Sequence, residues 1–317
     1  MPLSRMLARC ATSPIRRWVL DAFPRGQSGV DYDQPAGDAG LFGPDSVTWR
    51  IHADFPGMLA GGLSSLMLQA LHPRVLAGVY DHSNFRHDLV GRLRRTTAFV
   101  AGTTYAATDQ ARHLIERVRR IHHQVRGTTA DGLAYAADDP DLLTWVHVTE
   151  AHGFLQGYRH YCQAVPEALA DRYYDEGRRV AQALGARQVP ASQAQVQAYF
   201  EAMQPQLRFD ARSREVMAVL ARIRLPVPLA GLSRDLFLGA AAALLPDWAP
   251  PLLALGRADR ARAAVSSAAL RTMAPLFRMA LTDGVCARAC ARIPVPLEQL
   301  HRWPTQAEVP SAFTAPG

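Results

Sequence analysis

The sequence predicts an all-α protein built as a single multi-helix domain. Apolar and small residues recur at three or four positions, as along the run that contains Leu89, Leu93 and Val100. This spacing is typical of amphipathic helices. No convincing run alternates apolar and polar residues as a β-strand would, and neither an internal repeat nor a low-complexity linker divides the chain.

We divide the chain into three segments. Residues 1–45 are predicted to form an N-terminal arm that packs over the core, because several glycines interrupt any periodicity after a short amphipathic stretch at 16–23. Residues 46–302 form the helical domain, and residues 303–317 form a loose C-terminal tail.

The first long helix of the domain is predicted over 57–71, ending before Pro73. Gly61, Gly62, Ser64 and Ser65 give this helix a thin face, which suits either a flat cofactor or a crossing helix. We favour close packing of a second helix. A short helical turn at 74–80 and a connection rich in capping residues follow.

The next helices are predicted over 85–108 and 109–125, with Gly127 as the stop signal of the second. Asp139 and Pro140 form an N-cap followed by a first-position proline. They begin a long helix that is rich in histidine and aromatic residues and ends near Cys162. Later helices are expected at 166–184, 193–203, 213–225, 229–245 and 258–281.

Composition excludes several classes of function. All 35 basic residues are arginines, so enzymes that require a lysine, such as Schiff-base enzymes and Walker A nucleotide-binding proteins, are excluded. The net charge of +7 comes from arginines scattered through periodic helices, and we therefore expect no nucleic-acid partner. The motifs of zinc peptidases, di-iron bundles and serine hydrolases are absent.

The expected location is cytoplasmic. Ser13–Leu20 resembles a twin-arginine export signal, but Asp21, Pro24 and Arg25 follow without an apolar region. The longest uncharged run, Pro56–Leu71, is shorter than a membrane span. We expect membrane contact to be at most peripheral.

Two neighbouring helices carry residues that could hold a haem. Arg92, Arg95 and Thr96 lie close together on the first, while His122 and Arg126 lie four residues apart on the second. A neutral imidazole is a suitable axial ligand for haem iron, and guanidinium groups pair with propionates. These residues predict a haem between the two helices, with iron bound to His122.

Other interpretations of these residues stay open. His147, beside Trp145 on the next helix, is an alternative iron ligand, and His123 is a weaker one. Isolated histidines are more often structural than ligands. Arg92 and Arg95 could also belong to a solvated basic helix face.

The order of motifs over residues 50–165 closely resembles the latex-clearing-protein (rubber oxygenase) and MpaB-type oxygenase family. The motifs are Leu71-His-Pro73, His82-Ser83-x-Phe85, Arg92-Leu-x-x-Thr96, Ile121-His122-x-x-Val125-Arg126-Gly127, Asp139-Pro140 and Trp145-Val-His147. The resemblance implies a helical fold with a globin-like core and a non-covalent b-type haem. It implies His122 as proximal ligand, Arg92 and Thr96 as a signature pair, and O2-dependent cleavage of an unsaturated isoprenoid.

One position departs from the family pattern. Where latex-clearing proteins carry a lysine before the threonine, this chain has Arg95, and a guanidinium is a poor iron ligand because it stays protonated. We expect an open distal site with Arg95 and Thr96 near O2.

The expected function is that of a haem b-dependent oxygenase acting on a small hydrophobic, unsaturated substrate of lipid or isoprenoid type. O2 and this substrate are the expected partners, and an electron donor is a further candidate. The alternatives are a haem-binding sensor without catalytic activity and a helical protein without a cofactor.

Overall fold

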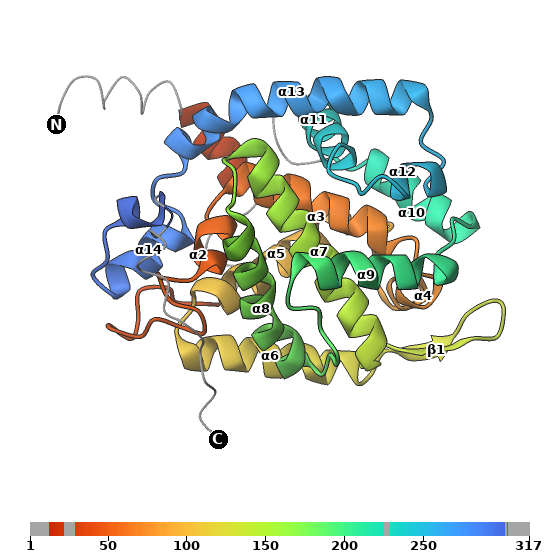
Figure 1. Cartoon of the computed structure of the whole chain (residues 1–317), viewed down its shortest axis with the longest axis horizontal. Coiled ribbons are helices and arrows are strands. Elements are labelled where there is room, and N and C mark those ends of the chain that lie inside the picture. Colours follow the sequence, from red (N-terminus) through yellow and green to blue (C-terminus); the bar gives the residue numbers. More distant parts are fainter. Residues whose placement is uncertain (1–12, 22–28, 225–228, 302, 304–317) are drawn as a thin grey trace.

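The computed structural model describes residues 13–21, 29–224, 229–301 and 303, and it confirms the all-α prediction (Figure 1). Most of the predicted tail lies outside the described residues, as do parts of the arm. After a helical segment at 13–21, the long helices are α2 (Val47–His52), α3 (Phe55–Gln69), α4 (Pro73–His82), α5 (Leu89–Tyr105), α6 (Thr108–His122), α7 (Pro140–Tyr161), α8 (Glu167–Leu184), α9 (Gln193–Met203), α10 (Ala211–Ala221), α11 (Ala230–Ala242), α13 (Arg257–Ala280) and α14 (Val285–Arg292). The shorter elements are α12 (Ala249–Leu252), η1 (Gln204–Gln206), η2 (Leu297–His301) and the strands β1 (Arg126–Thr128) and β2 (Ala134–Ala136).

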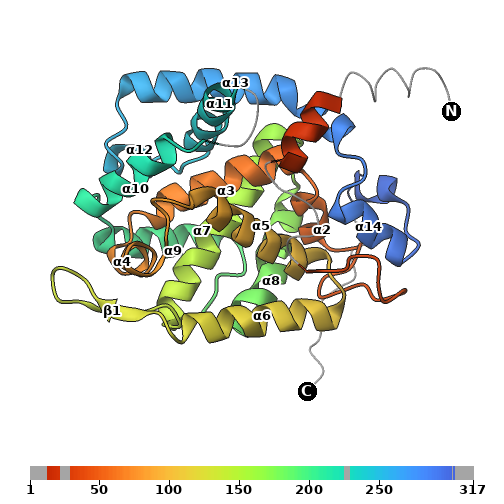
Figure 2. The ribbon, with the colours of Figure 1, turned by 180° about the vertical axis from the view of Figure 1, so that it is seen from behind.

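Helices α3 and α7 form the most extensive helix pair and cross in the middle of the molecule (Figures 1 and 2). Glycines at the crossing let the two backbones touch. A Cβ atom on Gly61 would lie 2.3 Å from the Gly153 carbonyl oxygen, and one on Gly57 would lie 2.9 Å from the Gly157 carbonyl carbon. The thin face predicted for the first long helix therefore packs against another helix, as favoured above.

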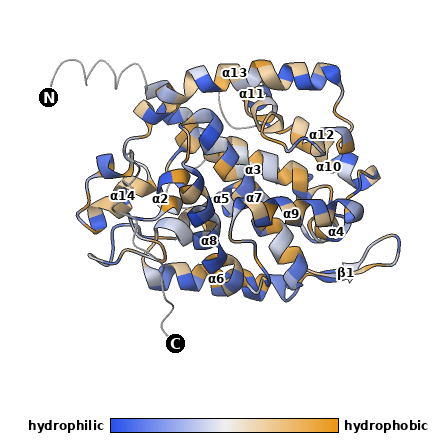
Figure 3. Ribbon diagram, in the orientation of Figure 1, coloured by the Kyte–Doolittle hydropathy of each residue, from blue (hydrophilic) through white to orange (hydrophobic). Residues whose placement is uncertain are grey.

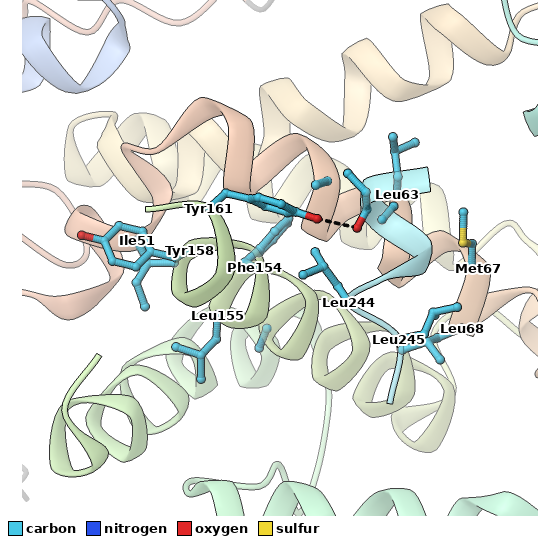
Figure 4. Packing of buried hydrophobic residues seen from close by; sticks show 14 of the residues in the cluster. Ile51, Leu63, Met67, Leu68, Phe154, Leu155, Tyr158, Tyr161, Leu244 and Leu245 are labelled. Atoms are coloured by element: carbon cyan, nitrogen blue, oxygen red, sulfur yellow. Dashed lines mark hydrogen bonds between the residues drawn. The ribbon is translucent and has the colours of Figure 1, made fainter. Parts of the chain in front are cut away.

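The main core surrounds this crossing (Figure 4). Phe154 and Leu155 of α7 are buried with Leu63 of α3 and with Leu244, which follows α11. The Tyr161 hydroxyl donates a 2.7 Å hydrogen bond to the Ala240 carbonyl oxygen, joining the end of α7 to α11.

The predicted arm contributes directly to the core. The Trp18 ring is buried, stacks on Phe237 and meets Phe277 edge-on. Further along the arm, the side chain of Asp38 accepts hydrogen bonds from the backbone and hydroxyl groups of Thr108, at the start of α6. The arm is thus anchored at both of its described parts.

The prediction for the end of α6 is wrong in detail. This helix ends at His122, and Gly127 lies in a two-stranded antiparallel hairpin opposite Tyr135 instead of acting as a helix stop. The Tyr135 hydroxyl lies 2.4 Å from the position that a Cβ atom on Gly127 would occupy. The glycine is therefore required by the aromatic ring that covers it.

Adjacent glycines of α3 provide a test of the central crossing. Gly61→Ala places a methyl group against the α7 backbone and is expected to destabilise the protein by about 2 kcal/mol or more. Gly62→Ala is the matched control, because its Cβ would meet only Phe154 Cε1 at 3.5 Å. Alanine stabilises a helix by about 1 kcal/mol relative to glycine, and this gain is the same in both variants. Urea unfolding of both variants measures the difference, and equal stabilities would contradict the backbone contact.

Candidate functional site

Arg92 is the central residue of the candidate site. It lies in the first turn of α5, after the N-cap Asp88, and its side chain is half-buried. Burial lowers its pKa, the charge of Arg95 lowers it further, and Glu150 acts in the opposite direction. Among the described residues no carboxylate lies within salt-bridge distance of Arg92, whereas many other arginines have such a partner.

Glu150 of α7 shares this poorly solvated environment. Burial raises the pKa of its carboxyl group to about 7, although the Arg92 charge opposes the shift. His147 lies three residues earlier, on the same side of α7. Burial lowers the pKa of its imidazole to about 4, so that the ring is neutral at pH 7. The sequence prediction missed Glu150, although its helical spacing from His147 could have revealed it.

His52 at the end of α2 closes one side of this region. Its Nδ1 lies 2.8 Å from Thr104 Oγ1, and its Nε2 lies 3.0 Å from the Tyr173 hydroxyl oxygen. The Thr104 hydroxyl already donates to the Val100 carbonyl oxygen, so it accepts from Nδ1–H while Tyr173 donates to Nε2. Both nitrogens of His52 are thus engaged, and burial together with His147 lowers its pKa to about 3.

His122 is the last residue of α6 and is half-buried. Burial lowers the pKa of its imidazole, with Asp138 raising it and His123 lowering it. Its Nδ1 atom is buried without a hydrogen-bond partner in the part of the chain that the structure describes. A buried polar atom without a partner is uncommon in folded proteins.

The two other predicted residues near His122, His123 and Arg126, both contact the carboxylate of Asp138. His123 Nδ1 lies 2.6 Å from Asp138 Oδ2, so this imidazole is held by a carboxylate. Arg126 lies in β1, where its exposed guanidinium is 3.3 Å from the same oxygen. Arg126 was expected one helical turn after His122, and the end of α6 at His122 removes that geometry.

Arg95 and Thr96, three and four residues after Arg92, lie on the surface. The Arg95 side chain is 69% exposed and donates to Asp88 at 3.2 Å, and Thr96 is also exposed. Arg95 and Thr96 are therefore in solvent, whereas Arg92 is half-buried.

Helices α5 and α6 touch near their connection, where a Cβ atom on Gly102 would lie 2.2 Å from Leu114 Cδ1. A haem could not lie between them at that level. Arg92 and His122 lie away from this contact, in the first turn of α5 and at the last residue of α6. Ile121, beside His122, is 51% exposed although it is apolar.

An apolar pocket of about 40 Å³ lies beside Arg92. It is enclosed by α3, α4, α5 and α10, and its lining includes Leu66, Val79, Phe85, Leu89, Met217 and Leu220. Arg92 is the only charged side chain among the lining residues that the structure describes. A permanent positive charge thus borders a hydrophobic pocket.

His122, His147 and Arg92 include the types of donor that a haem requires. One axial imidazole binds the iron of a haem, and cationic side chains pair with its propionates. Among the described residues, His122 Nδ1 has no hydrogen-bond partner, Arg92 has no carboxylate within salt-bridge distance, and burial keeps the His147 imidazole neutral. The same part of the chain contains no group of three His, Cys, Asp or Glu side chains that could hold a metal ion.

Comparison with known proteins gives one family. The model of the family described as "ER-bound oxygenase mpaB/B'/Rubber oxygenase, catalytic domain" matches residues 49–279. An uncharacterized protein of Mycobacterium bovis and another of Mycobacterium tuberculosis are each 28% identical over 159 residues. These matches cover 49% of this chain and 62% of each relative. No solved structure matches significantly.

The raised pKa of Glu150 predicts a pH-dependent effect of Glu150→Gln on stability. Its pKa is about 7 in the folded protein and has an ordinary value of 4.5, so the unfolded chain ionises first as pH rises. The folded state therefore loses stability between these two values. Glu150→Gln removes this loss. The difference in melting temperature, variant minus wild type, should therefore increase as the pH is raised from below 4.5 to above 7.

Thermal unfolding over this pH range measures the change. Glu201→Gln, at an exposed position of α9, is the control and should show a constant difference from the wild type. A pH-independent difference for Glu150→Gln would contradict the buried state of this carboxyl group.

Proposed function

The chain belongs to the mpaB/rubber oxygenase family, and from this we propose that it is a haem b-dependent oxygenase for a small hydrophobic, unsaturated substrate. The family supports a general oxygenase role. The haem, the lipid or isoprenoid character of the substrate and the need for an electron donor are parts of the proposal.

The observation that carries the proposal is the state of Arg92. A half-buried guanidinium without a carboxylate partner is unfavourable in the isolated protein. It becomes favourable when an anion binds or when negative charge develops nearby during a reaction. Haem propionates and O2 undergoing reduction both provide such charge, and Arg92 borders a pocket of about 40 Å³ that is otherwise lined by uncharged, mostly apolar side chains.

His122 is the proposed axial ligand, and bound haem would supply the capacity to activate O2. His147 is the alternative ligand, since its neutral imidazole makes no hydrogen bond to the described residues and rests against Gly177 of α8. Arg126 would have to exchange Asp138 for a propionate. Arg95 and Thr96 stay predicted contributors at the exposed rim.

Glu150 is proposed to hold and release a proton near Arg92. A carboxyl group with a pKa of about 7 is present in both protonation states at neutral pH, which is the condition for efficient proton transfer. The positive charge of Arg92 favours its ionised form. The pair therefore couples charge stabilisation to proton movement.

An absorption spectrum tests the haem and its ligand. Purified or reconstituted wild-type protein should show a Soret band, and His122→Ala should lose it because one imidazole nitrogen holds the iron. His147→Ala should retain the band. A colourless wild-type protein that cannot be reconstituted with haem would exclude both the oxygenase and the haem sensor, and the reverse pattern in the variants would assign the ligand to His147.

Arg92→Ala tests the catalytic role of the guanidinium. We expect O2 consumption with unsaturated isoprenoid or lipid substrates to fall about 100-fold, since one positioned donor for developing charge is removed. The Soret band should persist. Arg112→Ala on α6 is the control. The Arg112 side chain is 69% exposed, and its ion pair with Asp109, at 3.7 Å, lies on the surface. Haem-loaded wild-type protein that consumes no O2 with these substrates and a reductant would instead favour a sensor.

A further inference from the structure

Helix α13 has an unusual outer face. It lies along one edge of the molecule and packs inward on α11 and α3 (Figures 1 and 2). Its buried side includes Ser267, Leu270, Ala274 and Phe277. The opposite side should be polar if it faced only water.

The outward residues of α13 are instead almost all apolar. They include Val265 at 71% exposure, Leu276 at 44% and Met279 at 51%, together with the exposed small residues Ala258, Ala261, Ala268, Ala269 and Pro275. Thr272 and, in the first turn, Arg257 are the polar residues on this face. At about 1.5 Å per residue, a helix of 24 residues gives a stripe about 36 Å long. We call this stripe the outer face of α13.

Arginines accompany this apolar face. Helix α13 contains four exposed arginines, Arg257, Arg260, Arg262 and Arg271, but a single acidic residue, Asp259. Its fifth arginine, Arg278, bonds inward to the buried Asp54. Asp259 also accepts hydrogen bonds from Arg262 and from the Gly256 backbone. Hydrophobic and hydrophilic segments consequently alternate along α13 in Figure 3.

We propose that the outer face of α13 docks on an anionic lipid membrane surface, with the helix lying in the plane of the interface. An exposed apolar face flanked by arginines is the combination that binds such surfaces, because side chains enter the acyl boundary while guanidinium groups meet anionic headgroups. Charge decides between this partner and a second copy of the chain. Two copies of this face would both be positively charged, whereas an anionic surface is complementary.

The binding mode is peripheral. None of the described helices is long and apolar enough to cross a bilayer. Binding through one face of α13 requires no membrane-spanning helix, since only the outward side chains enter the lipid. This surface is formed by residues other than those of the candidate haem site, so the inference does not depend on the proposed function.

Vesicle sedimentation with the full-length protein tests the proposal. The wild type should co-sediment with vesicles of phosphatidylglycerol and phosphatidylcholine in equal parts, and not with pure phosphatidylcholine. Binding should weaken at high salt, since salt screens the headgroup charge. The double variant L276D/M279D should bind at least about tenfold more weakly than the wild type, because it places charged side chains where apolar ones enter the lipid.

The hairpin between β1 and β2 offers a matched control. Leu133 is 46% exposed, close to the 44% of Leu276, but lies away from α13. Leu133→Asp should bind vesicles as the wild type does. Equal binding by L276D/M279D and the wild type, with unchanged melting temperatures, would overturn the proposal. A second pair of results would also overturn it: the wild type does not bind vesicles, and light scattering shows a wild-type dimer that becomes a monomer in L276D/M279D.

Discussion

The backbone contact between α3 and α7 is the constraint on which the rest of the structure depends. Four glycines, Gly57, Gly61, Gly153 and Gly157, let the helices approach until backbone atoms of one helix lie where Cβ atoms on the other would be. A contact this close fixes the rotation of α7 about its own axis, because only the glycine side can meet α3. His147 then lies against Gly177 of α8, and Glu150 lies where the charge of Arg92 on α5 acts on it.

The orientation of α7 explains why its polar residues are so strongly perturbed. Burial disfavours the charged forms of His147 and Glu150, and Arg92 from α5 provides only partial compensation for Glu150. A fold selected for stability alone would pair these groups directly or replace them by apolar residues. Their retention in a weakly solvated region is typical of functional sites, where stability is lowered to hold reactive groups in position.

Sequence patterns predicted the helices because local chemistry determines most of them. Asp139 caps α7 with a side-chain hydrogen bond, as predicted, and Ser192 does the same for α9. The hairpin after His122 was not predictable, because Gly127 is covered by Tyr135 from a later segment. The same limit applies to the site: spacing placed Arg92 near Arg95, but only tertiary packing buries one, exposes the other and brings Glu150 close to Arg92.

The groups that the fold leaves unsatisfied are informative because it satisfies so many others. Arg278 bonds to the buried Asp54, and Arg288 bonds to Asp33 across a sequence separation of 255 residues. An arginine-only protein with this many internal partners could have paired Arg92 as well. Arg92 and His122 Nδ1 have no partner among the described residues, and the outer face of α13 is apolar and exposed, so each is unfavourable in isolation. The proposed partners, an anionic macrocycle at the first two and a lipid surface at the third, would relieve this.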